Sequence, residues 1–175
     1  MTTPNSPTGT LAGRLSTLAS DIIAATKADG QAAPVTLAHA CRGFVIAGAV
    51  SGLLDQYAIP RRDAFTICDE ACDRTVAMLT ELLGEHLLRR YSHGARRADL
   101  DTMLRHGQNE LLDATPEDID DIAAAMITLA AALRDALAPL PDNESLPPTT
   151  RGAARMAADT AAILHSHYGG DSGGW

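Results

Sequence analysis

The most apolar part of the chain lies between Ala40 and Leu54, where Arg42 is the single charged residue. Residues 43–54 carry no charge, and half of them are glycine, alanine or serine. A helix that is apolar on nearly every side has to be surrounded by other protein or by lipid. Small side chains would let neighbouring backbones approach it closely. The run therefore predicts a central helix, at about residues 35–57, around which the rest of the chain packs.

Apolar residues at helical spacing predict a helix on each side of this central helix. The earlier one is capped by Thr8 or Thr10 and ends at Asp29-Gly30. The later one begins at Pro60 and reaches about Tyr91, with Arg89 and Arg90 in its last turn, where they complement the helix dipole. Its buried stripe is expected to contain Phe65, Cys68, Cys72, Val76, Leu79 and Leu83, widened by Ala64, Ile67, Ala71, Met78 and Leu82.

Three more helices are predicted in the second half of the chain. One begins near Arg96 and contains Gly107, where the helix either continues or breaks into two pieces. The next begins at Thr115-Pro116, which offers a capping hydroxyl and a proline for the first helical position. Its apolar residues alternate spacings of three and four, the pattern of a bundle seam, as far as Pro139. The last helix turns Met156 or Ala157 toward the core.

The sequence thus predicts an all-α fold of about six helices in a mostly antiparallel bundle around residues 35–57. Residues 8–138 are expected to form the bundle, 1–7 a disordered lead-in and 169–175 a flexible tail. A stiff proline-rich connector, 139–149, precedes a C-terminal helix, 150–168, that would pack on the bundle or on a partner. We find no β-strand run and no internal repeat in the sequence.

The overall composition disfavours several classes of function. A net charge of −8 and an aromatic content of only 3% argue against nucleic-acid binding, which needs basic surface and stacking platforms. The central run is too short for the roughly 20 apolar residues of a membrane span, so none is expected. Three cysteines in no spaced framework and a polar start to the chain indicate a reducing, cytoplasmic location.

Three cysteines are the first candidates for chemistry. Cys68 and Cys72 lie one turn apart, and Cys41 on the central helix could face them. Three thiolates would suit a soft metal or a redox reaction, but a fourth metal ligand is missing. Cysteine is among the most buried residue types, so we interpret all three as core residues. We expect no metal and no cofactor.

A basic cluster is the second candidate, because it reverses the sign of charge in an acidic chain. Guanidinium groups at a helix end could hold a phosphate, a carboxylate or an acidic partner. A solvated corner, in which the arginines complement a helix end and nearby acids, explains the same pattern. The cluster consists of Arg89, Arg90, His93, Arg96, Arg97, Arg105 and His106.

Arg42 is the third candidate, since a guanidinium in an apolar helix must be paired or reach water. His39 lies three residues earlier and would share its face. An acid from a neighbouring helix would satisfy Arg42, and so would an anionic ligand in a pocket between the helices.

No catalytic or phosphate-binding motif gives grounds for naming an enzyme. We therefore expect a non-enzymatic interaction, adaptor or regulatory protein that binds another protein. The C-terminal helix would give a homodimer if it docked on a second copy. The alternatives are an anion-binding protein with its pocket at Arg42 and His39, and phosphate or nucleic-acid contact through residues 89–105. Trp175, in the glycine-rich tail, is either idle or inserted into a partner.

Overall fold

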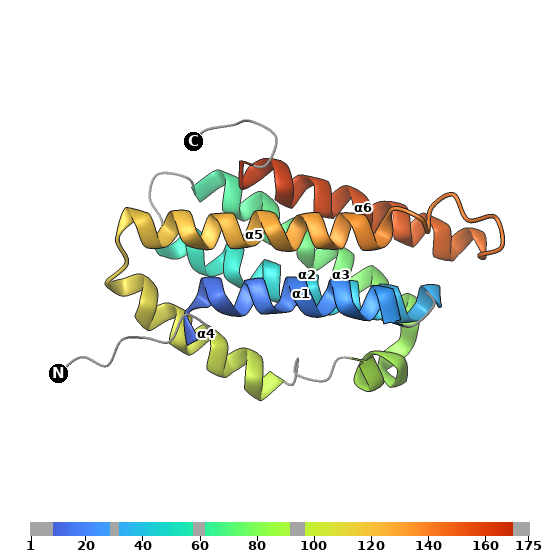
Figure 1. Ribbon diagram of the computed structural model, residues 1–175, viewed down its shortest axis with the longest axis horizontal. Coiled ribbons are helices and arrows are strands. Elements are labelled where there is room, and N and C mark those ends of the chain that lie inside the picture. Colours follow the sequence, from blue (N-terminus) through green and yellow to red (C-terminus); the bar gives the residue numbers. More distant parts are fainter. Residues whose placement is uncertain (1–8, 29–31, 58–61, 92–96, 170–175) are drawn as a thin grey trace.

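The computed structural model describes residues 9–28, 32–57, 62–91 and 97–169, and these residues form six helices and no strand. The predicted all-α bundle is confirmed, and Figure 1 shows its long helices lying side by side. The helices are α1 (Leu11–Ala28), α2 (Ala33–Tyr57), α3 (Arg62–Tyr91), α4 (Arg97–Leu112), α5 (Pro116–Leu137) and α6 (Pro148–His167).

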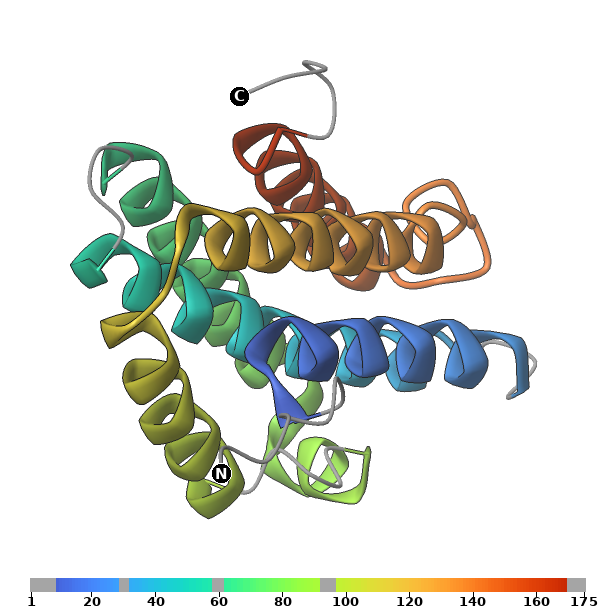
Figure 2. The ribbon, with the colours of Figure 1, turned by 60° about the vertical axis from the view of Figure 1, so that its left-hand side comes forward.

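The helix α2 is the centre of the fold, as its composition predicts. It contacts each of the other five helices, and more than half of its residues are buried. In Figure 2, α2 runs through the middle of the molecule, with α5 and α6 on one side and α4 on the other. Of the described helices, α2 alone is long and apolar enough to cross a membrane. In its apolar stretch of 18 residues, 72% is buried inside the protein.

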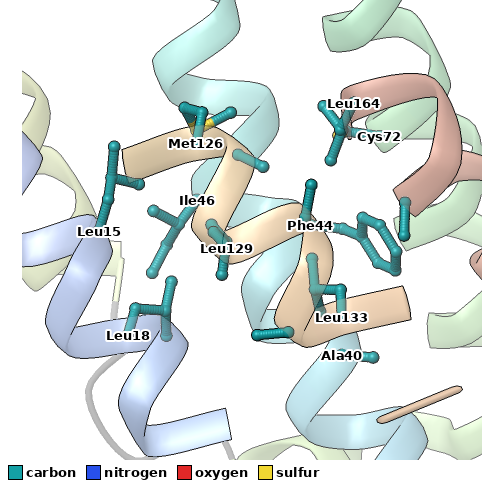
Figure 3. Close-up of a cluster of buried hydrophobic side chains, with 14 of the residues drawn as sticks. Leu15, Leu18, Ala40, Phe44, Ile46, Cys72, Met126, Leu129, Leu133 and Leu164 are labelled. Carbon is teal, nitrogen blue, oxygen red and sulfur yellow. The ribbon is translucent and has the colours of Figure 1, made fainter. Parts of the chain in front are cut away.

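Two glycines explain how closely the neighbouring helices approach α2. A Cβ atom added at Gly48 would lie 3.0 Å from the Cβ atom of Cys72 on α3. A Cβ atom added at Gly43 would lie 2.8 Å from a methyl carbon of Leu133 on α5. Both distances are shorter than ordinary contacts, so α3 and α5 occupy space that a side chain on α2 would fill. Figure 3 shows Phe44, between these glycines, in the core with Leu133 and Leu164.

The predicted helix starts are also present. Thr10 caps α1, because its hydroxyl accepts a hydrogen bond from the backbone N–H of Gly13 at 3.1 Å. Thr115 and Asp118 form a reciprocal capping box at the start of α5, with Pro116 as the first helical residue. The carboxylate of Glu110 on α4 additionally accepts the backbone N–H of Leu11 at 3.0 Å. The first turn of α1 is therefore completed by a side chain from the fourth helix.

Two glycines in helical patterns behave differently. The α3 helix reaches Tyr91 as predicted, but it is interrupted at Gly84, whose backbone is not helical (φ 71°, ψ 154°). Glycine tolerates this left-handed φ because it has no Cβ atom. Gly107, where a break was one of two outcomes considered, lies inside a continuous α4. A Cβ atom there would lie 3.2 Å from Leu53, so this glycine serves close packing between α4 and α2.

The predicted inner face of α3 needs one correction, whereas the structure decides between the two alternatives given for α6. Ile67 was expected in the buried stripe of α3, yet it is 45% exposed. On α6 the buried residue of the predicted pair is Ala157, whereas Met156 is 48% exposed. Thr75 on α3 and Thr160 on α6 face each other, so they fix the rotation of both helices. That rotation leaves Ile67 and Met156 on the outside.

The C-terminal helix α6 packs against α5 and α3 of the same chain. The connection from α5 begins at Ala138, and it is folded onto the bundle through Leu140, whose side chain is only 3% exposed. Residues 1–7 of the predicted lead-in and most of the predicted tail, Trp175 included, lie outside the described residues.

Candidate functional site

Buried polar pairs join α6 to the two helices beneath it. The hydroxyl of Ser51 on α2 donates to the carbonyl oxygen of Ala47, so the Tyr168 hydroxyl is the donor in its 3.0 Å bond to Ser51. The Tyr168 ring also packs on Phe65 of α3, with 5.5 Å between ring centroids. Burial raises the pKa of Tyr168, so this phenol stays neutral. The pair is a structural anchor, because the hydroxyl is sealed from solvent.

The contacts between α3 and α6 set their relative register. Thr75 and Thr160 share a buried hydrogen bond of 2.7 Å. Phe65, ten residues before Thr75 on α3, contacts Tyr168, eight residues after Thr160. As the residue number rises on one helix it falls on the other, so α3 and α6 are antiparallel. Residues whose numbers add up to about 234 therefore lie at the same level. Met78 is then level with Met156, and Ile67 lies near the end of α6.

An apolar strip follows from this register and from the helical period. Taking the facing threonines as the inner direction, Ile67 and Met78 turn to one side of α3, and Met156 and Ile163 turn to the same side of α6. The side is the outer one, opposite α2. Ile67 and Met156 are exposed, and the other two residues are half-buried. We call these four residues the α3–α6 strip; it spans about 16 Å along α3.

Charged residues border the α3–α6 strip on both helices. On α3, Glu70 forms an exposed ion pair with Arg74 at 3.6 Å, and Glu81 lies further along the same border. On α6 the bordering acid is Asp159. Glu81 and Asp159 are exposed, and neither forms an ion pair or hydrogen bond within the described part of the chain. Two bases also stand at this border, and both are in exposed ion pairs within the chain: Arg74 with Glu70, and Arg155 on α6, one turn before Asp159, with Asp142 at 3.5 Å. The border acids without an ion pair among the described residues are therefore Glu81 on α3 and Asp159 on α6.

The three cysteines are buried free thiols. Burial raises the pKa of Cys41. Burial, together with the charge of Asp69, raises the pKa of Cys68 to about 12. Burial also raises the pKa of Cys72. These thiols are core residues that stay protonated at neutral pH, since desolvation disfavours a thiolate.

We expect the folded protein to resist alkylation of Cys68 by iodoacetamide at pH 7.5, because only the thiolate reacts. Stability should respond to pH with a definite sign. The neutral thiol is favoured in the fold, so this contribution is complete below the ordinary pKa of 9.0 and is lost as the pH rises toward 12. Mass spectrometry after timed alkylation measures the first effect. Protein unfolded in guanidinium is the control and should be modified at all three cysteines; rapid native modification of Cys68 would contradict the prediction.

Asp69 is a second group in an unfavourable environment. Its carboxylate lies against two glycines of α2, with Oδ2 at 3.2 Å from the position of a Cβ atom at Gly52. Burial, followed by the charges of Asp73, Asp55 and Glu70, raises the pKa of Asp69. Within the described ranges, no group of three or more His, Cys, Asp or Glu side chains is arranged to hold a metal ion. We therefore assign no metal to these acids.

Arg42 lies half-buried on α2 and carries an unsatisfied atom. Its Nε is buried and has no hydrogen-bond partner, and no described acid forms an ion pair with Arg42. Pairing with an acid from a neighbouring helix, one of the explanations considered for Arg42, does not occur among the described residues. His39 is also half-buried on α2 and takes part in a polar interaction of its own.

The described members of the basic cluster are divided between two helices. Arg89 and Arg90 are exposed at the end of α3, and Arg89 binds Glu85 at 2.8 Å. Arg105 is exposed on α4, next to His106, which hydrogen-bonds to Arg14 at 3.3 Å. Over the described residues α3 and α4 do not pack against each other. His93 and Arg96 lie outside the described residues, and so does the side chain of Arg97, the first residue of α4.

Sequence reasoning missed the α3–α6 strip and the Ser51–Tyr168 anchor. Each residue was recognised as part of a helix, but the rotation of α3 and α6 depends on pairs separated by 85 and 117 residues. One signal was available. The apolar stripe predicted for α3 was wider than one neighbouring helix can cover, and its outer edge contains Ile67.

Comparison of the chain with protein-family models, with curated protein sequences and with solved structures finds no match.

Proposed function

We propose that this chain is a non-enzymatic protein-binding module and that the α3–α6 strip is its binding surface. The observation that carries the proposal is the outward position of Ile67 and Met156, which are 45% and 48% exposed on adjacent helices. The two side chains stand at opposite ends of the strip, about 16 Å apart, with the half-buried Ile163 between them and the half-buried Met78 beside Met156. Several large apolar side chains along one face are typical of interaction sites, whereas single exposed ones are not. Methionine suits such a surface because its flexible side chain adapts to a partner.

The strip also has the support that a binding surface needs. Directly beneath it, Thr75 and Thr160 hold α3 and α6 together, and the Tyr168 anchor fixes the end of α6 on α2. A partner would therefore meet a surface that is already assembled, and binding would cost little additional ordering. An apolar face of this shape accepts a helix that presents residues at spacings of three, four and seven.

Replacing Ile67 and Met156 together by Asp should abolish partner binding. Each apolar side chain removed from a desolvated interface loses about 1.5–3 kcal/mol, so each change should weaken binding about tenfold or more. The matched control is Leu112→Asp, which alters an exposed leucine (66%) on α4. Wild type and both variants are immobilised, and the proteins they retain are compared by quantitative mass spectrometry.

The proposal expects a protein that is retained by the wild type and by the Leu112→Asp variant but not by the double variant. Circular dichroism establishes that all three chains are folded before the comparison. If the three chains retain the same set of proteins, the strip is not the binding surface.

Arg42 favours a second candidate function, binding of a small anion. A buried guanidinium nitrogen without a partner is costly, and an oxyanion could satisfy it. On this hypothesis, inorganic phosphate or citrate should raise the melting temperature of the wild type but not that of the Arg42→Met variant. Because Arg42 forms no ion pair with a described acid, the substitution itself should cost little stability. A wild type that neither anion stabilises would exclude this function.

A further inference from the structure

We propose that the occupant of the α3–α6 strip is an amphipathic helix of a partner protein that carries basic residues on both sides of its apolar face. This inference rests on the proposed function, since it names the partner of the same surface. The argument comes from the charges that border the strip. Acids stand on both helices, and the two nearby bases, Arg74 on α3 and Arg155 on α6, are already paired with Glu70 and Asp142.

The two remaining acids define where the basic residues would lie. Asp159 on α6 is level with about residue 75 of α3, by the register of the facing threonines. Glu81 is six residues further along α3, on the opposite border. The two carboxylates are thus displaced by about 9 Å along the strip, because a helix rises 1.5 Å per residue. A helix lying along the strip would meet one acid on each flank, between one and two turns apart.

A second copy of this chain fits the same surface less well. It would bring another Glu81 and another Asp159 to a border that already holds these two acids without an ion pair, and the whole chain has a net charge of −8. Like charges opposed across an interface disfavour association, whereas opposite charges steer it and select the partner. The charge pattern therefore favours a basic helix over self-association.

Two synthetic helices test the inference directly. Both have leucine at positions i, i+3, i+4 and i+7 and a fluorescent label; one has lysines flanking the leucines, and the other has glutamates at the same positions. Fluorescence anisotropy should show the lysine peptide binding about tenfold or more tightly than the glutamate peptide, and less tightly as salt is added. The double variant Glu81→Lys/Asp159→Lys should reverse this preference.

The controls separate this inference from the proposed function. Ile67→Asp should weaken binding of the lysine peptide to the wild type and of the glutamate peptide to the Glu81→Lys/Asp159→Lys variant. If both peptides bind the wild type equally and Ile67→Asp abolishes both, the strip binds helices but the basic partner is wrong. If Ile67→Asp changes neither, or if no peptide binds, the surface itself is misassigned. A concentration-dependent dimer in sedimentation velocity that Ile67→Asp dissolves would make a second copy the occupant and overturn the inference.

Discussion

Replacing Phe44 by Ala is expected to lower the free energy of unfolding by about 3–5 kcal/mol, the usual cost of truncating a buried aromatic residue. Phe44 is completely buried on α2, and Figure 3 shows it in the core with Leu133 of α5 and Leu164 of α6. The cavity would open where several helices meet, so the surrounding side chains cannot all close it. Since domains of this kind are stable by about 5–15 kcal/mol, the variant should lose a large share of its stability. Urea unfolding followed by circular dichroism measures the effect.

Two controls give the Phe44 result its meaning. Phe44→Leu keeps most of the apolar volume and should cost much less than Phe44→Ala. Ile23→Ala removes an exposed side chain (41%) from α1 and should change stability by only about 0.5 kcal/mol. If Phe44→Ala proved no worse than Ile23→Ala, α2 would not be the packed centre of the bundle.

Replacing Tyr168 by Ala should be comparably severe and should act on one helix first. The ring is fully buried against Phe65, and its hydroxyl reaches Ser51 of α2. Its removal should cost about 3–5 kcal/mol and release the C-terminal end of α6. Amide hydrogen exchange should therefore accelerate in α6 more than in α5, because local unfolding begins where anchoring contacts are lost.

Tyr168→Phe separates the hydroxyl from the ring. It should cost only about 1 kcal/mol, because Ser51 keeps its own hydrogen bond to the carbonyl of Ala47. In a double-mutant cycle, the Ser51→Ala/Tyr168→Phe double variant should lose less free energy of unfolding than the two single variants lose in sum. Additive effects would mean that the hydroxyl–hydroxyl bond contributes nothing, and a mild Tyr168→Ala would contradict the anchor itself.

Local signals carried most of the fold prediction. The charge-free run before Leu54 identified the central helix, since a helix that is apolar on nearly every side has to be surrounded by other protein or by lipid. Thr115 and Pro116 fixed the start of α5 because capping depends on residues that are adjacent in sequence. Features of this kind can be predicted without knowing which helices pack together, and the structure contains both the central helix and the predicted start of α5.

Gly84 and Gly107 show where local reasoning ends. Both stand inside apolar helical patterns, and either could break a helix or let another one approach. Within the part of the chain that the structure describes, no atom of a neighbouring element lies within 4 Å of a Cβ position at Gly84, whereas Leu53 and Leu11 crowd the same position at Gly107. The outcome depends on which helix packs there. Ile67 was misplaced for the same reason, because its exposure is set by the rotation of α3 against α6.

The hydrogen bond from Leu11 to Glu110 has a consequence for synthesis on the ribosome. The two residues are 99 positions apart, and α1 packs chiefly against α5, which follows Glu110 in the chain. When α1 leaves the ribosome it has its local cap, Thr10, but it has neither the Glu110 contact nor its main neighbour α5 until α4 and α5 have been translated. Its apolar face must wait uncovered, and a holding chaperone would have its longest opportunity there.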